Sequence, residues 1–335
     1  PKEYFTLENG KDKFHSERGM PNVMNFESLA RTLKEEDLWP QSNKWGQHDY
    51  TMEGAQGGSS FNAIIAKGFG EPQSAKEFTE LAQWVNYDGY RAMFESRSLN
   101  RKGLLLWMTH PAWPSMVWQT YDYYFEPTAA YFGSMKGNEP LHVQWNAATD
   151  KVEVVNYSAG SHPALSVEAA LINMDGSVQW QKSALVASEE DTTVEAFALE
   201  FPASLSSAHF VKLWLKEGDN VVSDNFYIRG TEEGNFQAIR QMPKVELKQT
   251  ATVEQNADGS WSGSITLRND STTPALMIRV NVVGEKDGDQ ILPIFYSDNY
   301  VSLLGGEQRQ ITFRFKDVDT RGTTPKIVVT GYNVK

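Results

Sequence analysis

Residues 102–108, Lys-Gly-Leu-Leu-Leu-Trp-Met, are the stretch that decides the fold of the first part of the chain. A continuous apolar run of this kind is typical of a strand buried on both faces of a parallel sheet. It follows a helical pattern that starts at the capping-box pair Ser74 and Glu77 and carries apolar residues through Phe94. Helix, short turn and buried strand together predict an α/β unit.

Two more segments precede this unit. The spacing of apolar residues from Phe26 to Leu33 predicts a short amphipathic helix, with Asn25 as its N-cap. Residues 39–73 are rich in Gly, Ser, Gln and Asn, and we expect a long loop there. Long loops in compact domains are commonly functional, which makes this segment a place to look for binding residues.

The pattern changes near residue 136. From Asn138 onward, short runs alternate apolar and polar residues with a period of two, and turn residues such as Asp258-Gly259 separate the runs. Seven runs by residue 229, of which the first is 141–146, and six more after it, which include 275–284 and 290–295, predict two antiparallel sandwiches. We therefore expect an α/β segment over 1–136, one sandwich over 137–230 and a second over 231–335.

Composition excludes several classes of function. The net charge of −12 argues against non-specific nucleic-acid binding, and no apolar run is long enough to span a membrane. The chain has no cysteine, which excludes a disulfide scaffold, Cys-ligated metal and thiol catalysis. Six of the 10 tryptophans precede residue 137, whereas the histidines of the sandwiches are dispersed without metal-ligand spacing. Chemistry is therefore expected in the first segment.

Two places in that segment are suited to chemistry. Glu17 follows a short strand-like stretch and precedes Gly and Pro, which would place it at the C-terminal end of a strand, the catalytic rim of α/β barrels. The alternative is a surface carboxylate beside Arg18. Trp107 and Trp113 flank a Pro-containing loop after the apolar strand, and their flat faces suit sugar rings. The alternative for this pair is packing in the core.

At these residues the sequence resembles glycoside hydrolase family 2. Residues 14–21, Phe-His-Ser-Glu-Arg-Gly-Met-Pro, resemble the family's nucleophile segment. The strand at 103–107, followed by Trp-Pro-Ser at 113–115 and Asp-Tyr-Tyr at 122–124, is similar to the last barrel strand and the exit from the barrel. Ser-Asp-Asn-Tyr at 297–300 resembles the terminal immunoglobulin-like domain. The likeness is closest to the exo-β-D-glucosaminidase and β-mannosidase branch.

The resemblance implies the C-terminal part of a TIM (β/α)8 barrel followed by two immunoglobulin-like β-sandwich domains. It also implies a retaining hydrolysis of β-glycosides by two carboxyl groups, with no cofactor and no metal. Glu17 would be the nucleophile, Trp107 the floor under the sugar, and Trp113 and His15 further substrate-binding residues. A cationic or hydrogen-bonding neighbour of Glu17 is expected, with His15 and Arg18 as candidates. Because adjacent residues on a strand face opposite sides, His15 and Arg18 cannot both serve.

The second carboxyl group of the mechanism, the acid/base, is not found. In the family it lies on an earlier barrel strand, usually after Asn or Ser, and the 16 residues before Glu17 contain no such pair. Asn138-Glu139 comes after the barrel exit. A complete barrel takes about 250 residues, so we expect this chain to be the C-terminal portion of a longer enzyme, inactive without the N-terminal part of its parent chain.

The substrate stays open between β-linked glucosamine and β-linked mannose, in an oligosaccharide or a polysaccharide. Glucosamine carries an ammonium group at C2, for which Asp49, Glu53 and Asp88 are candidate partners. Tandem sandwiches also suit a non-catalytic carbohydrate-binding or assembly module, and this is the alternative function. A purely structural sandwich array would need no α/β segment. The family implies a periplasmic or secreted protein.

Overall fold

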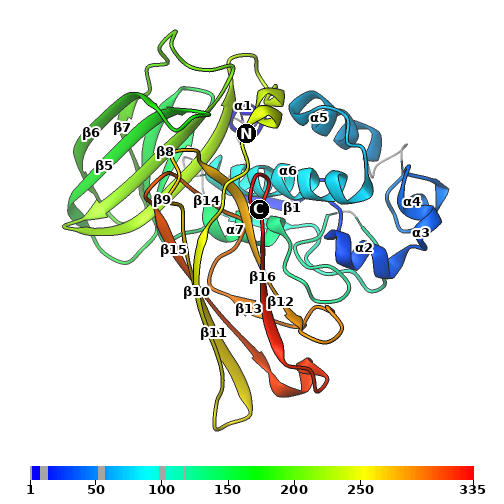
Figure 1. The fold of residues 1–335 in the computed structure, drawn as a ribbon. Coiled ribbons are helices and arrows are strands. Elements are labelled where there is room, and N and C mark those ends of the chain that lie inside the picture. The colour runs from blue at the N-terminus through cyan, green and yellow to red at the C-terminus, as the bar shows by residue number, and fades with distance from the viewer. Residues whose placement is uncertain (1, 8–13, 52–56, 98–102, 117) are drawn as a thin grey trace.

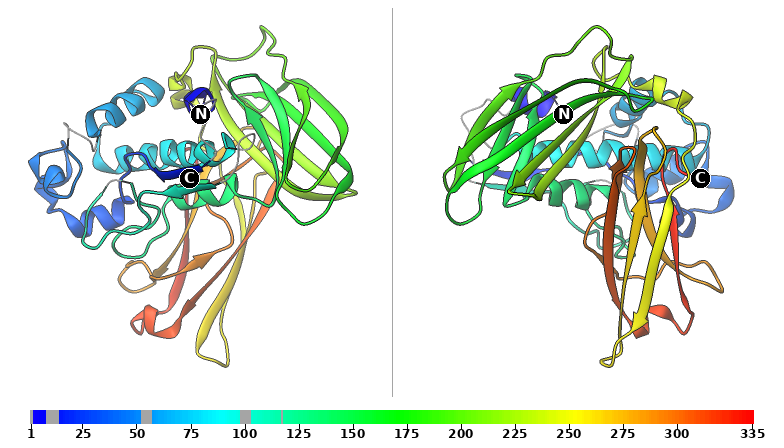
Figure 2. Two further views of the ribbon diagram at one scale, coloured as in Figure 1. Left: turned by 180° about the vertical axis from the view of Figure 1, so that it is seen from behind. Right: turned by 60° about the vertical axis from the view of Figure 1, so that its left-hand side comes forward.

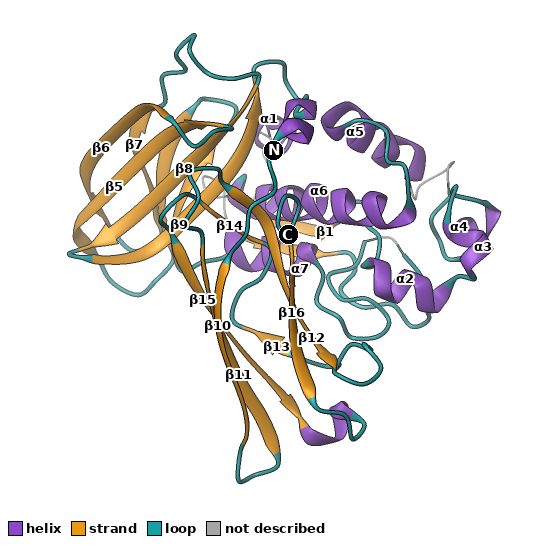
Figure 3. Cartoon of the chain, in the orientation of Figure 1, coloured by secondary structure: helices purple, strands orange, loops and turns teal. Residues whose placement is uncertain are grey.

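The computed structural model describes residues 2–7, 14–51, 57–97, 103–116 and 118–335 and consists of a helical part and two β-sandwiches (Figure 1). The helices gather at one end of the molecule, and the strands lie almost entirely in the sandwiches (Figure 3). Both views of Figure 2 show the two sandwiches extending from the helical part in different directions.

The helical part contains two strands that lie side by side. Its described elements are α1 (Lys2–Leu7), β1 (Phe14–Arg18), α2 (Phe26–Thr32), α3 (Glu35–Leu38), α4 (Asn43–Gln47), α5 (Gly58–Phe69), α6 (Ala75–Glu95), β2 (Gly103–Leu106) and α7 (Ala129–Gly137). β1 and β2 pair in parallel, with Phe14 opposite Gly103 and Arg18 opposite Leu106. The order of α6, β2 and a parallel partner confirms the predicted α/β unit.

The burial of β2 differs from the prediction. Leu104 and Leu106 pack against the core of the helical part, but Leu105 points away from it and is 56% exposed. Among the described residues, the apolar run therefore covers one face of the two-stranded sheet, and its other face is open to solvent.

The predicted loop over 39–73 is also wrong. It contains α4 and the 12-residue helix α5, whose Phe61, Ile65 and Phe69 form a buried stripe at i, i+4 and i+8. Packing of this stripe outweighs the low helix propensity of the Gly, Ser and Asn residues around it. Two helices therefore occupy part of the segment whose composition indicated a loop.

Both predicted helix starts are confirmed. The Ser74 hydroxyl accepts a hydrogen bond from the backbone N–H of Glu77 at 3.1 Å, so α6 begins as the capping box predicts. The Glu77 carboxylate binds the N–H of Gln73 rather than that of Ser74. Asn25 lies at the N-cap of α2, but its side-chain amide binds the Tyr300 hydroxyl at 2.9 Å and so joins this helix to the second sandwich.

Glycines bring α7 close to α6. A Cβ atom on Gly133 would lie 2.3 Å from the carbonyl oxygen of Tyr87, and one on Gly137 would lie 2.7 Å from that of Arg91. The two glycines are four residues apart and share one face of α7. Their missing side chains allow the two helices to pack backbone to backbone.

The first sandwich consists of a three-stranded sheet, β3-β4-β7, and a four-stranded sheet, β6-β5-β8-β9. The strands are β3 (Leu141–Asn146), β4 (Lys151–Asn156), β5 (His162–Asn173), β6 (Val178–Ser188), β7 (Thr192–Ala198), β8 (Ala208–Glu217) and β9 (Asn220–Gly230). All pairings are antiparallel. Val, Leu, Trp, Phe and Tyr side chains from both sheets form the core between them.

The second sandwich pairs the four-stranded sheet β10-β11-β15-β13 with the three-stranded arrangement β14-β12-β16. The strands are β10 (Lys248–Gln255), β11 (Ser260–Arg268), β12 (Ala275–Gly284), β13 (Phe295–Tyr296), β14 (Val301–Leu303), β15 (Gln308–Lys316) and β16 (Pro325–Thr330). Two short 3-10 helices, η1 (Gln237–Gln241) and η2 (Asp317–Thr320), lie before β10 and after β15. The predicted strand over 290–295 shrinks to the two residues of β13, and β14 was not predicted.

A buried polar network joins α6 to the first sandwich. The Glu95 carboxylate accepts hydrogen bonds from Tyr227 at 2.8 Å and Asn225 at 2.9 Å, and it lies 3.0 Å from His142 Nε2. Arg91 donates to Asn225 at 2.8 Å and stacks on the Tyr227 ring, 4.0 Å from its centroid. The end of α6 is therefore tied to β3 and β9 by charged groups that are shielded from water.

Candidate functional site

Glu17 lies in an irregular part of β1. The pairing with β2 shifts register between His15 and Arg18, where three steps along β1 match two along β2. Ser16 and Glu17 therefore oppose the single residue Leu105. This two-against-one arrangement is a β-bulge, a feature that redirects side chains and is over-represented beside active sites. The Glu17 side chain is exposed to solvent.

Among the described residues, neither predicted cationic neighbour forms an ion pair with the Glu17 carboxylate. The Arg18 guanidinium lies over the ring of Tyr4, 5.2 Å from its centroid, and His15 is half-buried on β1. Within the described part of the chain, the structure contains no ion pair to the Glu17 carboxylate. Burial raises the pKa of Tyr4 to about 12, although the positive charge of Arg18 acts to lower it. The Tyr4 hydroxyl beneath the Arg18 guanidinium therefore stays protonated and neutral.

Trp107 follows β2 directly beside the end of β1. Its backbone N–H donates to the carbonyl oxygen of Arg18 at 2.8 Å. A Cβ atom on Gly19 would lie only 2.2 Å from the Trp107 carbonyl oxygen, so this close approach requires glycine. The peptide bond between Trp107 and Met108 is cis. The strand ends thus place Trp107 next to the segment that carries Glu17.

Neither predicted sugar-binding tryptophan is a core residue. Trp107 is 47% exposed and Trp113 is 44% exposed. Trp113 stacks on the imidazole of His48, with ring centroids 5.5 Å apart and planes 25° apart. His48 Nδ1 is hydrogen-bonded to the Pro114 carbonyl, and the N–H of Met116 donates to the His48 carbonyl at 2.8 Å. His48 therefore positions the loop that presents Trp113.

Sequence reasoning missed His48. The segment over 39–73 was recognised as a place to look, but no local pattern connects a histidine there with a tryptophan 65 positions later. More aromatic surface continues along the same loop, where Phe125 is 54% exposed and stacks on His110 with ring centroids 4.5 Å apart. The loop after β2 therefore presents several apolar ring faces to solvent, which suits the C–H faces of sugars.

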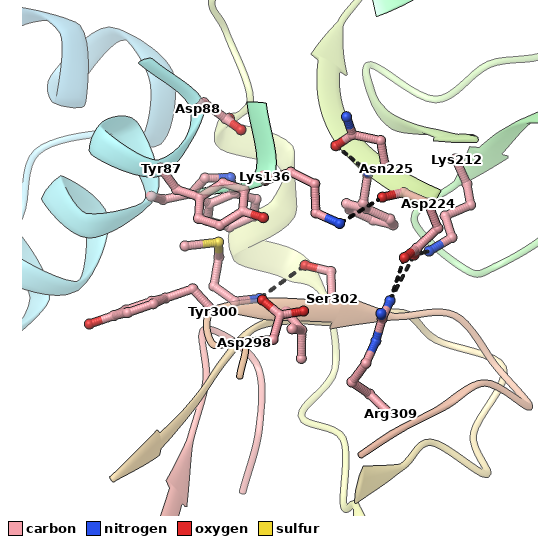
Figure 4. Close-up of a pocket in the computed structure, with 14 residues that line it drawn as sticks. Tyr87, Asp88, Lys136, Lys212, Asp224, Asn225, Asp298, Tyr300, Ser302 and Arg309 are labelled. Atoms are coloured by element: carbon pink, nitrogen blue, oxygen red, sulfur yellow. Dashed lines mark hydrogen bonds and ion pairs between the residues drawn. The ribbon is translucent and has the colours of Figure 1, made fainter. Parts of the chain in front are cut away.

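The three acidic residues considered for an ammonium group have different positions. Asp49 is half-buried in a left-handed conformation with φ of 67°, next to His48. Glu53 lies outside the described residues. Asp88 is not available to bind a substrate ammonium group, because its carboxylate is paired with Arg91 at 2.6 Å. It lines a pocket between the helical part and the sandwiches (Figure 4).

The described residues also bear on metal binding and on membrane-spanning helices. They include no group of three or more His, Asp or Glu side chains arranged to hold a metal ion. They also include no helix that is both long and apolar enough to cross a membrane.

Comparisons with known proteins match this architecture. Residues 225–334 match the family described as the exo-β-D-glucosaminidase Ig-fold domain, which confirms the immunoglobulin-like fold expected for the second sandwich. The match begins within β9, so it includes the second half of the last strand of the first sandwich.

Two relatives and one solved structure show how far the similarity extends. An exo-β-D-glucosaminidase of Streptomyces avermitilis is 28% identical over 98% of this chain and 40% of its own length. A mannosylglycoprotein endo-β-mannosidase of Lilium longiflorum is 26% identical over 86% of this chain and 37% of its own length. The fold matches the Amycolatopsis orientalis exo-chitosanase in complex with PNP-β-D-glucosamine, with a TM-score of 0.88, 23% identity, and coverage of 99% of this chain and 44% of that one.

The resemblance inferred from the sequence, to a glycoside hydrolase of the exo-β-D-glucosaminidase and β-mannosidase branch, is thereby confirmed. The chain spans about 40% of the length of the curated relatives that it matches.

Proposed function

We propose that this chain is the part of a retaining exo-acting β-glycoside hydrolase of family 2 that carries the nucleophile, Glu17. In this proposal, β1 and β2 with their helices are the last part of a (β/α)8 barrel, and two immunoglobulin-like domains follow. The observation that carries it is the exposed Glu17 at a bulged strand end, with the half-exposed Trp107 at the end of the adjacent parallel strand.

The proposed reaction has two steps. The Glu17 carboxylate attacks the anomeric carbon and forms a covalent glycosyl-enzyme, while a second carboxyl group protonates the departing oxygen. The second group then removes a proton from water, which attacks the same carbon and releases the sugar with retention and Glu17 as a free carboxylate. The two carboxyl groups must stand about 5–5.5 Å apart.

The acid/base group is proposed to lie outside residues 1–335, in the N-terminal part of the parent chain. The greater length of the curated relatives supports this proposal. It predicts that the 335-residue chain alone does not hydrolyse glycosides and that the parent chain does. The proposed location of the parent is periplasmic or extracellular, where its polymeric substrates would be met.

The proposed substrate is a β-linked glucosaminide. The names of the relatives support it, and a β-mannoside is the second candidate because one relative is named a mannosidase. Trp107 would lie under the sugar ring, Trp113 on its His48 support would form a side wall, and the half-buried His15 would contact the substrate from β1. Activity of the parent on paired nitrophenyl β-glucosaminide and β-mannoside substrates decides between them.

The nucleophile is tested in the parent chain with Glu17→Gln and Glu17→Ala. We expect at least a thousandfold loss of kcat for both, because the covalent step has no attacking group. Sodium azide should restore turnover of Glu17→Ala by attacking from the vacated side, with the α-glycosyl azide as product. Glu36→Gln, at an exposed glutamate of α3, is the matched control and should keep full activity. Near-normal activity of Glu17→Gln would refute the assignment.

The alternative is a non-catalytic carbohydrate-binding or assembly module, which the presence of two tandem sandwiches favours. Calorimetric titration of the 335-residue chain with chitosan and manno-oligosaccharides tests it directly. Binding without hydrolysis by either the chain or its parent would favour the module.

A further inference from the structure

A hollow lies between the two sandwiches and α7. It has a volume of about 380 Å³ and is continuous in its lining with a smaller inner cavity of about 30 Å³. Lys136, Asp224, Asp298 and Arg309 line both (Figure 4). We call the two together the inter-sandwich cleft. None of its lining residues belongs to β1 or to the loop after β2, so it is separate from the candidate site at Glu17.

The charges in this cleft do not balance. Its lining contains five carboxylates and three cationic side chains: Asp88, Glu139, Asp224, Asp298, Glu307, Lys136, Lys212 and Arg309. Neighbours satisfy four of the carboxylates. Asp88 pairs with Arg91, Glu139 with Lys136, Asp224 with Lys212 and Arg309, and Glu307 with Lys212.

Asp298 is the carboxylate left over. Its Oδ1 atom accepts a hydrogen bond from the backbone N–H of Asn299 at 2.9 Å, and the described residues provide no ion pair for it within 4.0 Å. Figure 4 shows its carboxylate in the cavity, across from Lys136 and without a marked partner. Burial raises the pKa of Asp298, although Lys136 and Arg309 act to lower it. A further positive charge in the cleft would stabilise the ionised carboxylate.

The walls of the cleft have two different characters. On the β8–β9 side, the half-buried indole of Trp214 and the exposed side chains of Val221 and Val222 form an apolar surface. On the β15 side, Gln308 and Gln310 present exposed amide groups. A ligand that fits has an apolar face, hydroxyl groups on its rim and a positive charge. The apolar wall makes an organic cation a better match than a metal ion.

We propose that the inter-sandwich cleft binds an amino sugar. Its ammonium group pairs with Asp298, the C–H face of its ring lies against Trp214 and Val222, and its hydroxyl groups bind Gln308 and Gln310. The volume lies within the range of small-molecule sites. The choice of an amino sugar rests on the proposed function, whereas the cleft and its unbalanced carboxylate do not. Because the lining comes from both sandwiches, an occupied cleft holds them in one relative orientation.

The test is calorimetric titration of the 335-residue chain with D-glucosamine, and with N-acetyl-D-glucosamine as the uncharged comparator. We expect D-glucosamine to bind at least tenfold more tightly than the comparator. Asp298→Asn should weaken D-glucosamine binding at least tenfold. Val222→Lys places a repelling cation on the exposed rim without touching the interior, and it should have the same effect. Glu285→Gln removes an exposed carboxylate elsewhere on the second sandwich and should leave binding unchanged.

Glu17→Gln separates this site from the proposed active site, because binding in the cleft should not respond to it. The inference is overturned if D-glucosamine does not bind, if binding survives both Asp298→Asn and Val222→Lys, or if it is lost in Glu17→Gln. A chain that binds D-glucosamine in the cleft while its parent hydrolyses no β-glycoside would leave this inference standing and refute the proposed function.

Discussion

Replacing Arg91 with methionine tests how the helical part is held to the first sandwich. The Arg91 side chain is 1% exposed, and its guanidinium binds Asp88 at 2.6 Å, Asn225 at 2.8 Å and the carbonyl of Phe226 at 2.7 Å. Methionine has a similar length and fills the same space above Tyr227. The variant therefore removes the charge and the hydrogen bonds and changes the volume little.

The expected loss in the free energy of unfolding depends on the carboxylates that Arg91 leaves unpaired. Removing one partner of a buried ion pair costs about 3–5 kcal/mol, because the remaining charge stays out of water. Without the Arg91 guanidinium, the Asp88 carboxylate loses its ion-pair partner, and the Asp88 side chain is only 17% exposed. Glu95, also within 3.9 Å of Arg91, keeps its contact with His142. The loss should thus lie at the lower end, about 3 kcal/mol.

Urea unfolding followed by tryptophan fluorescence measures this loss. Arg314→Met is the matched control, since Arg314 is exposed, lies over the Phe295 ring at 5.3 Å and should change stability by less than about 0.5 kcal/mol. Adding Asp88→Asn to Arg91→Met neutralises the stranded carboxylate and should recover at least about 1 kcal/mol as a coupling energy. If Arg91→Met falls within about 1 kcal/mol of its control, the network does not hold the interface as argued.

Three further predictions concern pH and packing. Hydrogen bonds to Glu139 and Glu95 outweigh burial and raise the pKa of His142. His142→Gln should therefore lower the stability most below about pH 6.5, and the loss should become smaller as pH rises through the raised pKa of His142. Thermal unfolding across pH measures this loss. Burial raises the pKa of Glu126 to about 7, although the paired Arg279 acts to lower it. The contribution of Glu126 to native stability should therefore fall as pH rises from about 4.5 to 7, and Glu126→Gln should make the stability less dependent on pH over that range. Gly19→Ala should cost about 1–3 kcal/mol and alter the near-ultraviolet circular dichroism of tryptophan, because the new methyl group meets the Trp107 carbonyl; an unchanged spectrum would contradict this packing.

The sandwiches could be predicted well because alternation with a period of two is a local signal. β3 and β12 have the bounds that the pattern predicts, Leu141–Asn146 and Ala275–Gly284. β14 (Val301–Leu303) was missed because three residues are too few to show a period. α5 was missed because the Gly, Ser and Asn residues in and around it outweighed the stripe of Phe61, Ile65 and Phe69, whose burial stabilises the helix.

The candidate site was predictable in its residue types and not in its arrangement. Glu17, Trp107 and Trp113 stand out by motif and composition. The bulge that aims Glu17 depends on register with β2, which lies about 90 residues later in the chain. The stacking of His48 on Trp113 likewise joins distant segments. Contacts of this kind depend on tertiary packing, for which a single sequence carries no local pattern.

The helix α6 connects the candidate site with the sandwiches. At its middle, a Cβ atom on Gly89 would lie 2.2 Å from the sulfur of Met20, three residues after Glu17. At its end, Arg91 and Glu95 enter the first sandwich. A chimera that exchanged this sandwich for one from a distant relative would sever the polar network and loosen the helix that supports the Glu17 segment. Domain grafting should therefore succeed only when α6 travels together with the sandwich it enters.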